Sequence, residues 1–579
     1  MKKFCVFCML LSLTLSAFPQ TQSAPDAQPS TVIRANTRLV LVDVVATDHK
    51  GVPVTGLTAQ DFTVLEDGKP QTVSSFSFQK PNAVTAGENP APRKLPPNVF
   101  TNVPGYKSGG ALNVILLDAL NTTNLNQATV HDNLLKVMQK LPNDRPVAVY
   151  ALGRRLTLLQ DFTTDPALLQ TALKGLKGKN SPVLASPTGG LQDQWVPPSV
   201  AQQMPPGMLL RIQEFMQANT AATTDLRVDY TLDALQALAR SLAGYPGRKN
   251  LIWVSESFPL SITNASTLNL VHGSRGDRNY SLQLAHTADV LTSAQVAVYT
   301  VDARGISNAT VFSASGLSSA SDQMGRPMRP GTQQEQVERD NDETQANRST
   351  ENDVAQSTGG EAFYNTNDFG KVILKSMEDG STYYSLAYAP GNKNWDGRFR
   401  KIQVKTSRSG VKLRYRTGYF ASDPQAYEKE DQAQRNRDLA QALNFDFPAS
   451  TALLFEARVL PPSESTGNKV AITFAIDPHP IVFEKQQDDL QHADLTCAVQ
   501  VYSNKGQPLR TEAASLKAAL PADIYDRVMK SHLPCQQTVD LPPGDYLLRL
   551  GIRDNNTGLM GTADARVSVT GGAGNKPAQ

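Results

Sequence analysis

The segment NVILLDAL, residues 113–120, is an almost unbroken apolar run that contains the carboxylate of Asp118 near its end. Runs of the same character follow at PVAVYALG (146–153), LTLLQDFT (156–163), NLIWVSES (250–257) and VAVYTVDA (296–303). Between them, apolar residues recur with helical spacing at 127–141 and 230–242. Parallel strands covered by helices need apolar residues on both faces. The alternation therefore predicts an α/β domain with a mostly parallel sheet and helices on both of its faces.

β-rich segments are predicted on both sides of this domain. Residues 25–80 alternate between apolar and polar residues, as half-buried strands do, and residues 81–110, rich in Pro, Gly and Asn, indicate a linker. Residues 446–570 contain further alternating runs between Gly, Pro and Asn turns, which predicts a C-terminal β-sandwich of immunoglobulin or fibronectin type. The charged segment 421–445 is predicted to be a helical connector, and 571–579 a disordered tail.

The central domain is assigned to residues 111–420, with two long insertions at 177–224 and 315–350. The second insertion is polar and nearly devoid of large apolar residues, so we expect it to be disordered. The first is rich in Pro, ends in the helix-like segment MLLRIQEFMQAN, and is placed to fold over the strand ends and shape a binding surface. Three strand-like runs within 383–420 are expected to extend the domain.

The first 24 residues have the layout of a secretory signal peptide. Lys2 and Lys3 precede an apolar run at 4–15 that is too short to span a bilayer comfortably, and small residues follow. A membrane-anchoring or buried N-terminal helix is the alternative. We expect an exported protein, periplasmic or extracellular, and no membrane span in the mature chain, because no other segment approaches about eighteen uninterrupted apolar residues.

Cysteine content and charge limit the chemistry further. After cleavage of the signal peptide only Cys497 and Cys535 remain, and in an oxidising compartment we expect them to form a disulfide, with two free buried thiols as the alternative. The formal net charge is +2, with acidic and basic residues mixed along the chain. No basic stripe is available, so no nucleic-acid partner is expected.

Several separated segments carry a resemblance to a known family. They are VILLDALNTTN (114–124), YPGRKNLIWVSES (245–257), AQVAVYTVDARGI (294–306), VAQSTGGEAFYNTND (354–368) and the strand-rich stretch 383–420. Together they resemble a von Willebrand factor A domain and, more narrowly, the exported "VWFA-related" family found in acidobacteria. The resemblance covers about residues 112–420 and the N-terminal β module. It implies a doubly wound sheet and an adhesion-type protein that binds a protein or glycan ligand at the cell envelope.

The resemblance also implies a metal-ion-dependent adhesion site for Mg²⁺ or Mn²⁺, built on an Asp-x-Ser-x-Ser loop. Asp118 matches the first position and Thr122 supplies a hydroxyl at the last, but Leu120 replaces the middle serine, so the site is degenerate. Glu256 stands where the family has an Asp after the fourth strand. A later threonine is not fixed by spacing, since Thr224, Asp229 and Thr231 all lie in the relevant stretch.

Asn121, Thr123 and Thr231 are therefore the predicted ligand rim beside the tentative metal residues Asp118, Thr122 and Glu256. A polar rim without metal is the alternative, in which Asp118 accepts hydrogen bonds from backbone amides at the start of the following helix.

Motifs of strict geometry that would mark an enzyme are absent from the mature sequence. It contains no Gly-x-Ser-x-Gly, no His-Glu-x-x-His, no phosphate-binding Gly-rich loop with Lys and no Cys-x-x-Cys. We therefore predict a non-enzymatic binding protein. The alternatives are an enzyme-associated or hydrolytic envelope protein with an unrecognised site, and an envelope scaffold without a ligand.

Overall fold

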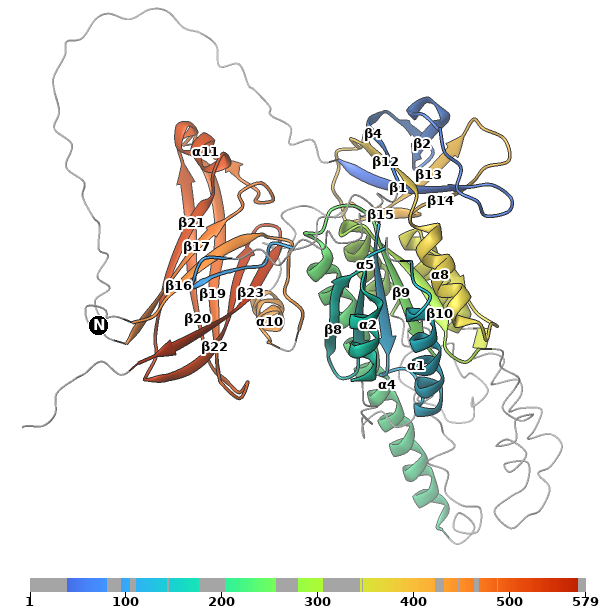
Figure 1. The fold of residues 1–579 in the computed structure, drawn as a ribbon, viewed down its shortest axis with the longest axis horizontal. Helices are drawn as coiled ribbons and strands as arrows, with labels where there is room; N and C mark the ends of the chain where they lie inside the picture. The colour runs from blue at the N-terminus through green and yellow to red at the C-terminus, as the bar shows by residue number, and fades with distance from the viewer. Residues whose placement is uncertain are drawn as a thin grey trace, which may run out of the picture. The chain divides into compact units, whose positions relative to one another are not determined.

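The central feature of the computed structural model is a six-stranded mixed sheet (Figure 1). Its order is β11-β10-β9-β6-β7-β8, in which β8 runs antiparallel to β7 and the other neighbours are parallel. The strands are β6 (Leu112–Asp118), β7 (Val147–Leu152), β8 (Leu156–Thr163), β9 (Lys249–Ser255), β10 (Val296–Asp302) and β11 (Ala362–Phe363). The five runs predicted as strands are all strands of this sheet, which makes the fold mixed α/β.

The structure describes residues 39–80, 95–104, 111–142, 145–175, 204–256, 280–305, 344–345, 347–421, 432–445, 447–462, 468–486 and 488–570. The predicted signal peptide at 1–24, most of both insertions and the tail at 571–579 lie outside the described residues.

Helices pack on both faces of the sheet. They are α1 (Asn124–Met138), α2 (Pro166–Lys174), α4 (Pro206–Leu242), α5 (Ser281–Ser293) and α8 (Phe369–Asp379), with a further helical segment at 347–358. Alternate residues of β6 enter different cores: Val114 and Leu116 pack with residues of α4 and α5, while Ile115 and Leu117 pack with residues of α1, α2 and α8. This two-sided burial explains the apolar character of the strand.

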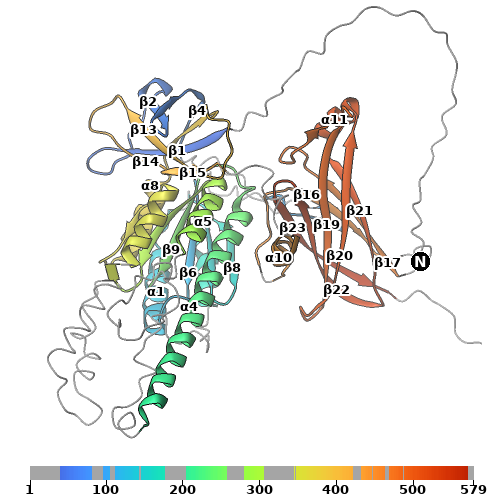
Figure 2. The ribbon, with the colours of Figure 1, turned by 180° about the vertical axis from the view of Figure 1, so that it is seen from behind.

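Helix α4 is longer than the sequence predicted. It runs unbroken over 37 residues and includes the end of the predicted insertion at 177–224 as well as the helix expected at 230–242. In both views it extends beyond the ends of the sheet strands (Figures 1 and 2). Among the described side chains of this helix, those that pack in the core of the sheet lie at 234–242, so the two apolar patterns look separate in sequence.

A β module combines strands from two distant parts of the chain. Its sheets have the orders β14-β1-β12-β4 and β15-β13-β2-β3. The strands are β1 (Val40–Thr47), β2 (Phe62–Glu66), β3 (Lys69–Gln71), β4 (Val73–Gln79), β12 (Tyr383–Tyr388), β13 (Phe399–Thr406), β14 (Lys412–Arg414) and β15 (Gly418–Phe420), and a short 3-10 helix spans Ala59–Asp61. The runs within 383–420, expected to extend the central domain, thus pair with the N-terminal strands and share one apolar core with them.

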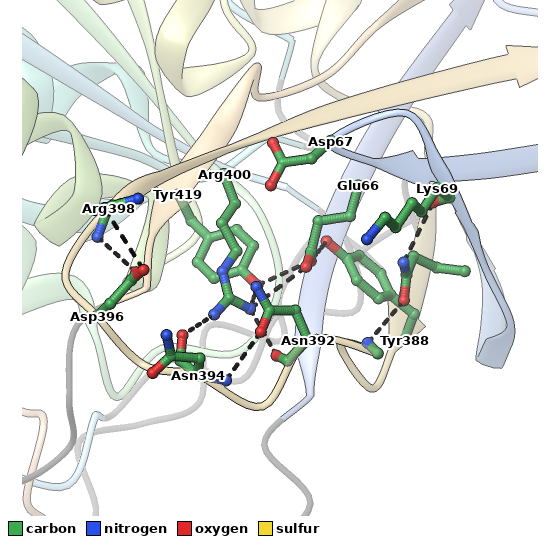
Figure 3. Close-up of polar contacts among 12 residues, drawn as sticks. Glu66, Asp67, Lys69, Tyr388, Asn392, Asn394, Asp396, Arg398, Arg400 and Tyr419 are labelled. Atoms are coloured by element: carbon green, nitrogen blue, oxygen red, sulfur yellow. Dashed lines mark hydrogen bonds and ion pairs between the residues drawn. The ribbon is translucent and has the colours of Figure 1, made fainter.

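A buried ion pair links the two halves of this module (Figure 3). Glu66, at the end of β2, lies 3.4 Å from Nη1 of Arg400 on β13, and their side chains are 2% and 3% exposed. The hydroxyls of Tyr388 and Tyr419 each donate a 2.8 Å hydrogen bond to Oε2 of Glu66. Burial, followed by the contact with Glu66, raises the pKa of both tyrosines, so they remain donors. The Glu66 carboxylate is thus fully paired.

The loop after β12 completes the surroundings of Arg400. The guanidinium donates to the backbone carbonyls of Asn392 and Asn394 and lies 5.1 Å from the ring centre of Trp395. These contacts hold the loop against the module core (Figure 3).

Two further sheets form the C-terminal region and share one apolar core. Their orders are β21-β17-β16-β5 and β18-β19-β22-β23, with β20 also paired to β19. The elements are β5 (Val99–Thr101), β16 (Phe455–Leu460), β17 (Lys469–Ile476), β18 (Glu484–Lys485), β19 (Gln491–Ser503), β20 (Pro508–Leu520), β21 (Leu533–Asp540), β22 (Gly544–Asp554), β23 (Met560–Val569) and α11 (Ala522–Met529). Helix α10 (Gln432–Ala442) lies in the segment predicted as a connector.

Two long-range links organise these C-terminal sheets. A disulfide joins Cys497 on β19 to Cys535 on β21, so it bridges the two sheets, and both residues are buried in the shared core. Strand β5 comes from the predicted linker 81–110 and pairs with β16. A three-residue edge strand has no readable period, and sequence patterning therefore missed it.

The paired charges of the β module give a testable expectation. Glu66→Ala should lower the free energy of unfolding by about 3–5 kcal/mol, because it leaves the Arg400 guanidinium buried without its carboxylate. Urea unfolding monitored by tryptophan fluorescence would measure the change. Lys69→Ala, an exposed control on the adjacent strand, should change the value by less than about 0.5 kcal/mol. An equal loss in both variants would contradict the role given to the ion pair.

Candidate functional site

The polar residues singled out in the sequence gather at the carboxyl edge of the six-stranded sheet. Asp118 ends β6, Ser255 ends β9 and Asp302 ends β10. These strands are parallel neighbours in the order β10-β9-β6, so their carboxyl ends meet at one edge. Ligands of open α/β sheets bind at this edge.

Asp118 is buried, with 2% of its surface exposed, and receives four hydrogen bonds. The backbone N–H of Asn121 donates to Oδ1 at 2.9 Å, and its side-chain Nδ2 donates to Oδ2 at 2.9 Å. Trp253 Nε1 and Ser255 Oγ also donate to Oδ2, at 3.0 and 2.9 Å. Burial raises the pKa of Asp118, and the hydrogen bonds from Asn121, Ser255 and Trp253 oppose that rise. Three of these donors reach Oδ2 and one reaches Oδ1, so both oxygens of the carboxylate are engaged.

Asn121 connects this carboxylate to helix α4. Its Nδ2 donates to Thr231 Oγ1 at 2.9 Å, and its Oδ1 accepts hydrogen bonds from Arg227 Nε and Nη2 at 3.2 and 3.1 Å. Thr231 Oγ1 in turn donates to the backbone carbonyl of Arg227, one helical turn earlier. Arg227 is 3% exposed, so its positive charge lies inside the network. Sequence reasoning missed Arg227, because nothing in an arginine four residues before a threonine indicates that it points inward.

Glu256 joins the loop after β9 to the start of α1. Its Oε2 accepts from Thr123 N at 2.6 Å and from Thr123 Oγ1 at 2.7 Å, and its own N–H donates to Thr122 Oγ1 at 3.1 Å. Thr123 is the N-cap residue of α1, where an anionic side chain is favoured by the orientation of the peptide dipoles. The structure thus brings together all the residues predicted for the metal and the rim.

The donor set does not fit a divalent cation. Leu120, at the position of the missing serine, is 1% exposed and packs in the core shared with α4 and α5. Both oxygens of Asp118 are already engaged, and the Asn121 side-chain oxygen is taken by the Arg227 guanidinium. Within the described residues no group of three His, Cys, Asp or Glu side chains is arranged to hold a metal ion. A cation at Asp118 would have to displace protein donors, which hard-cation sites avoid.

A second acidic cluster at this edge was not predicted from the sequence. Arg304 forms a bidentate pair with Asp302, with Nε 2.9 Å from Oδ1 and Nη2 2.8 Å from Oδ2. Glu351, on the helical segment 347–358, is fully buried, and neither of its carboxylate oxygens accepts a hydrogen bond from any residue that the structure describes. Burial, and then the neighbouring Asp302, raise the pKa of Glu351 to about 8, while Arg304 and Arg348 oppose the rise. At neutral pH this side chain is therefore mostly a neutral acid.

Comparisons with known proteins give little further information. No family model and no curated protein matches the chain. Among solved structures, the chain is similar to an aerotolerance-related membrane protein from Bacteroides fragilis at 13% identity and a TM-score of 0.23, over 46% of this chain and 98% of that protein. It is similar to BatB, a conserved hypothetical protein from Bacteroides thetaiotaomicron, at 14% identity and a TM-score of 0.21, over 46% and 97%.

The human COPII-coat protein Sec24c aligns at 11% identity and a TM-score of 0.21, over 58% of this chain and 48% of that one. TM-scores this low carry no argument about fold or function. Among the described helices, none is long and apolar enough to cross a membrane.

The buried Glu351 gives a pH-dependent expectation. Its pKa is about 8 in the folded chain, above its ordinary value of 4.5. The wild-type protein therefore loses stability as the pH rises from about 4.5 through 8, because the folded state holds a proton that the unfolded state releases. Glu351→Gln should remove this loss. The free energy of unfolding of the variant minus that of wild type should therefore be roughly 2–4 kcal/mol larger at pH 9 than at pH 5.

Chemical denaturation at a series of pH values would measure this difference. Asp353→Asn, an exposed acid on the same helical segment, is the matched control and should track wild type. A Glu351→Gln variant whose stability follows the wild-type pH profile would show that Glu351 is ionised in the folded protein.

Proposed function

We propose that this chain is an exported, non-enzymatic binding protein of the cell envelope. Its central domain would be a von Willebrand factor A-like doubly wound domain that binds a protein or glycan at the carboxyl edge of the sheet, without a resident metal. The flanking β-rich regions would act as spacers or secondary contacts. The sequence resemblance and the N-terminal signal pattern support this assignment.

One observation carries the metal-free part of the proposal. The network Asp118–Asn121–Arg227–Thr231 ties the loop after β6 to α4, and the Glu256–Thr123 contact ties the same loop to β9. In this network Asn121, Trp253 and Ser255 donate the hydrogen bonds that hold the Asp118 carboxylate, and Arg227 holds the side-chain oxygen of Asn121. The rim is thereby held in one conformation before a ligand arrives, which favours affinity.

Exposed apolar side chains beside this edge fit a binding surface. Helix α4 extends past the strand ends, and there it exposes Met208 and Phe215, which are 51% and 73% accessible. Aromatic residues and Met are enriched where proteins bind one another. Tyr230, 40% exposed on the same helix, adds a group that can both stack and form a hydrogen bond.

Glu351 favours a second candidate function, a hydrolytic enzyme that uses a protonated carboxyl as a general acid. A glutamate with a pKa of about 8 is suited to that task. However, Glu351 is fully buried, and its neighbour Asp302 is committed to Arg304. Neither carboxylate is free to receive a substrate, whereas Met208, Phe215 and Tyr230 are exposed beside the same edge, so binding is the better-supported function.

Binding would be tested with the purified full chain on an immobilised glycan array and on isolated bacterial envelopes, with and without EDTA. Phe215→Ser should weaken binding at least about tenfold, as removal of a central aromatic contact does. Leu509→Ser, a change at another exposed apolar residue, 54% accessible and on β20, should bind like wild type. EDTA should have no effect. Equal binding of both variants would contradict the proposed surface. Absence of any binding would also contradict it and would favour a scaffold without a ligand.

A separate calorimetric titration tests metal independence. Mg²⁺ and Mn²⁺ titrated into wild type and Asp118→Ala should give no saturable heat in either. Asp118→Ala should nevertheless lower the free energy of unfolding by about 2–4 kcal/mol, because it removes the buried carboxylate to which Asn121, Trp253 and Ser255 all donate. Saturable heat in wild type that disappears in the variant would instead establish a working metal site at Asp118.

A further inference from the structure

A small polar cavity lies at the amino edge of the six-stranded sheet, where β9 and β10 begin and the β module contributes β1. Its volume is about 20 Å³ on the measure by which one water needs roughly 10–15 Å³, and it is partly open to solvent. The lining combines two arginines, one carboxylate, three uncharged polar residues and three apolar residues: Arg248, Arg416, Asp43, Thr292, Gln295, Thr358, Leu41, Val296 and Ala297.

Arg416, between β14 and β15, lacks an acceptor in this cavity. Its Nε is buried and has no hydrogen-bond partner, and its guanidinium donates no hydrogen bond to any residue in the described part of the chain. Its one contact of note is with the ring of Tyr419, 5.8 Å away. Burial lowers the pKa of Arg416, and the charges of Asp289 and Asp43 oppose that fall. Arg416 is partly exposed, yet a cation whose Nε lies out of water without an acceptor is costly unless a counter-charge accompanies it.

The nearest carboxylates are occupied elsewhere. Asp43 accepts from Ser385 Oγ at 2.8 Å through Oδ1 and from Gln295 Nε2 at 3.2 Å through Oδ2. Asp289 accepts from the backbone N–H of Phe420 at 3.2 Å. Neither carboxylate therefore neutralises Arg416 through a hydrogen bond.

Arg248, which immediately precedes β9, brings a second guanidinium to the cavity and is 2% exposed. Its Nε donates to Asn250 Oδ1 at 3.2 Å, and its Nη2 donates to Tyr299 OH and to the Gly359 carbonyl at 3.3 and 2.8 Å. Its Nη1 finds no acceptor among the described residues. Two positive charges and one negative charge thus line a cavity in which both guanidinium groups retain unused N–H donors.

We propose that this cavity is a binding site for a monatomic anion of the size of chloride, held by Arg416 and Arg248. The pocket is small and partly open to solvent, and a monatomic anion is the smallest counter-charge that fits beside the two guanidinium groups. The anion would supply the missing counter-charge and would join the segment after β14 to the start of β9, which strengthens the attachment of the β module to the sheet. This inference does not depend on the proposed function.

The test compares thermal unfolding of the full chain in sodium chloride or bromide with unfolding in sodium gluconate of equal ionic strength. Saturating halide should raise the Tm by about 2–4 °C, because it binds the folded state alone. Arg416→Gln should reduce the halide affinity at least about tenfold, while Arg416→Lys retains part of it. Arg408→Gln, an exposed arginine of the same β module, should respond like wild type.

Crystals soaked in bromide provide the second measurement. An anomalous peak between Arg416 and Arg248, absent from Arg416→Gln, would support the site even if that variant proved less stable. Equal Tm values in halide and gluconate, or water alone in the cavity, would overturn the proposal. A larger effect of sulfate than of chloride would also overturn it, because the occupant would then be an oxyanion.

Discussion

Burial of the central strands on both faces is the constraint on which the other features depend. Strand β6 sends alternate side chains into two apolar cores, so nothing polar can be placed along its length except at its ends. Because β6, β9 and β10 are parallel, their polar ends meet at one edge of the sheet and their beginnings at the other. The carboxyl edge holds the Asp118 network, and the amino edge holds the cavity with Arg248 and Arg416.

These two edges show how differently buried charges can be accommodated. Asp118 is surrounded by donors from Asn121, Trp253 and Ser255, so it functions as part of the scaffold. Glu351 is buried as deeply, but no described residue donates a hydrogen bond to it. It keeps its proton, and the neutral form needs no such donors. Arg416 cannot lose its charge in this way, since a guanidinium stays protonated at any ordinary pH. The lack of partners is thus met by a proton at Glu351 and, in our proposal, by a bound anion at Arg416.

The order of elements along the chain interleaves the β-rich regions with the α/β domain. Strands β1 to β4 precede the domain and β12 to β15 follow it, yet they share one core and one buried ion pair. Strand β5 lies between them in sequence and pairs with β16 near the C-terminus. The α/β domain is thus an insertion between β4 and β12, and pairing of the flanking strands holds its two ends together. Such pairing explains why Glu66 and Arg400, so distant in sequence, are both buried.

The sequence alone was sufficient for the strands of the central sheet, the helix that follows β6, the alternating strands of the flanking regions and the gathering of Asp118, Asn121, Thr122 and Glu256 at one edge. All of these follow from local periodicity and from the rule that parallel strands end together. The continuity of α4, the pairing of 383–420 with the N-terminal strands, the inward position of Arg227 and the isolation of Glu351 and Arg416 could be known only from the folded chain. Each depends on residues that are far apart in sequence or on the direction of a single side chain, and local patterns carry no information about either.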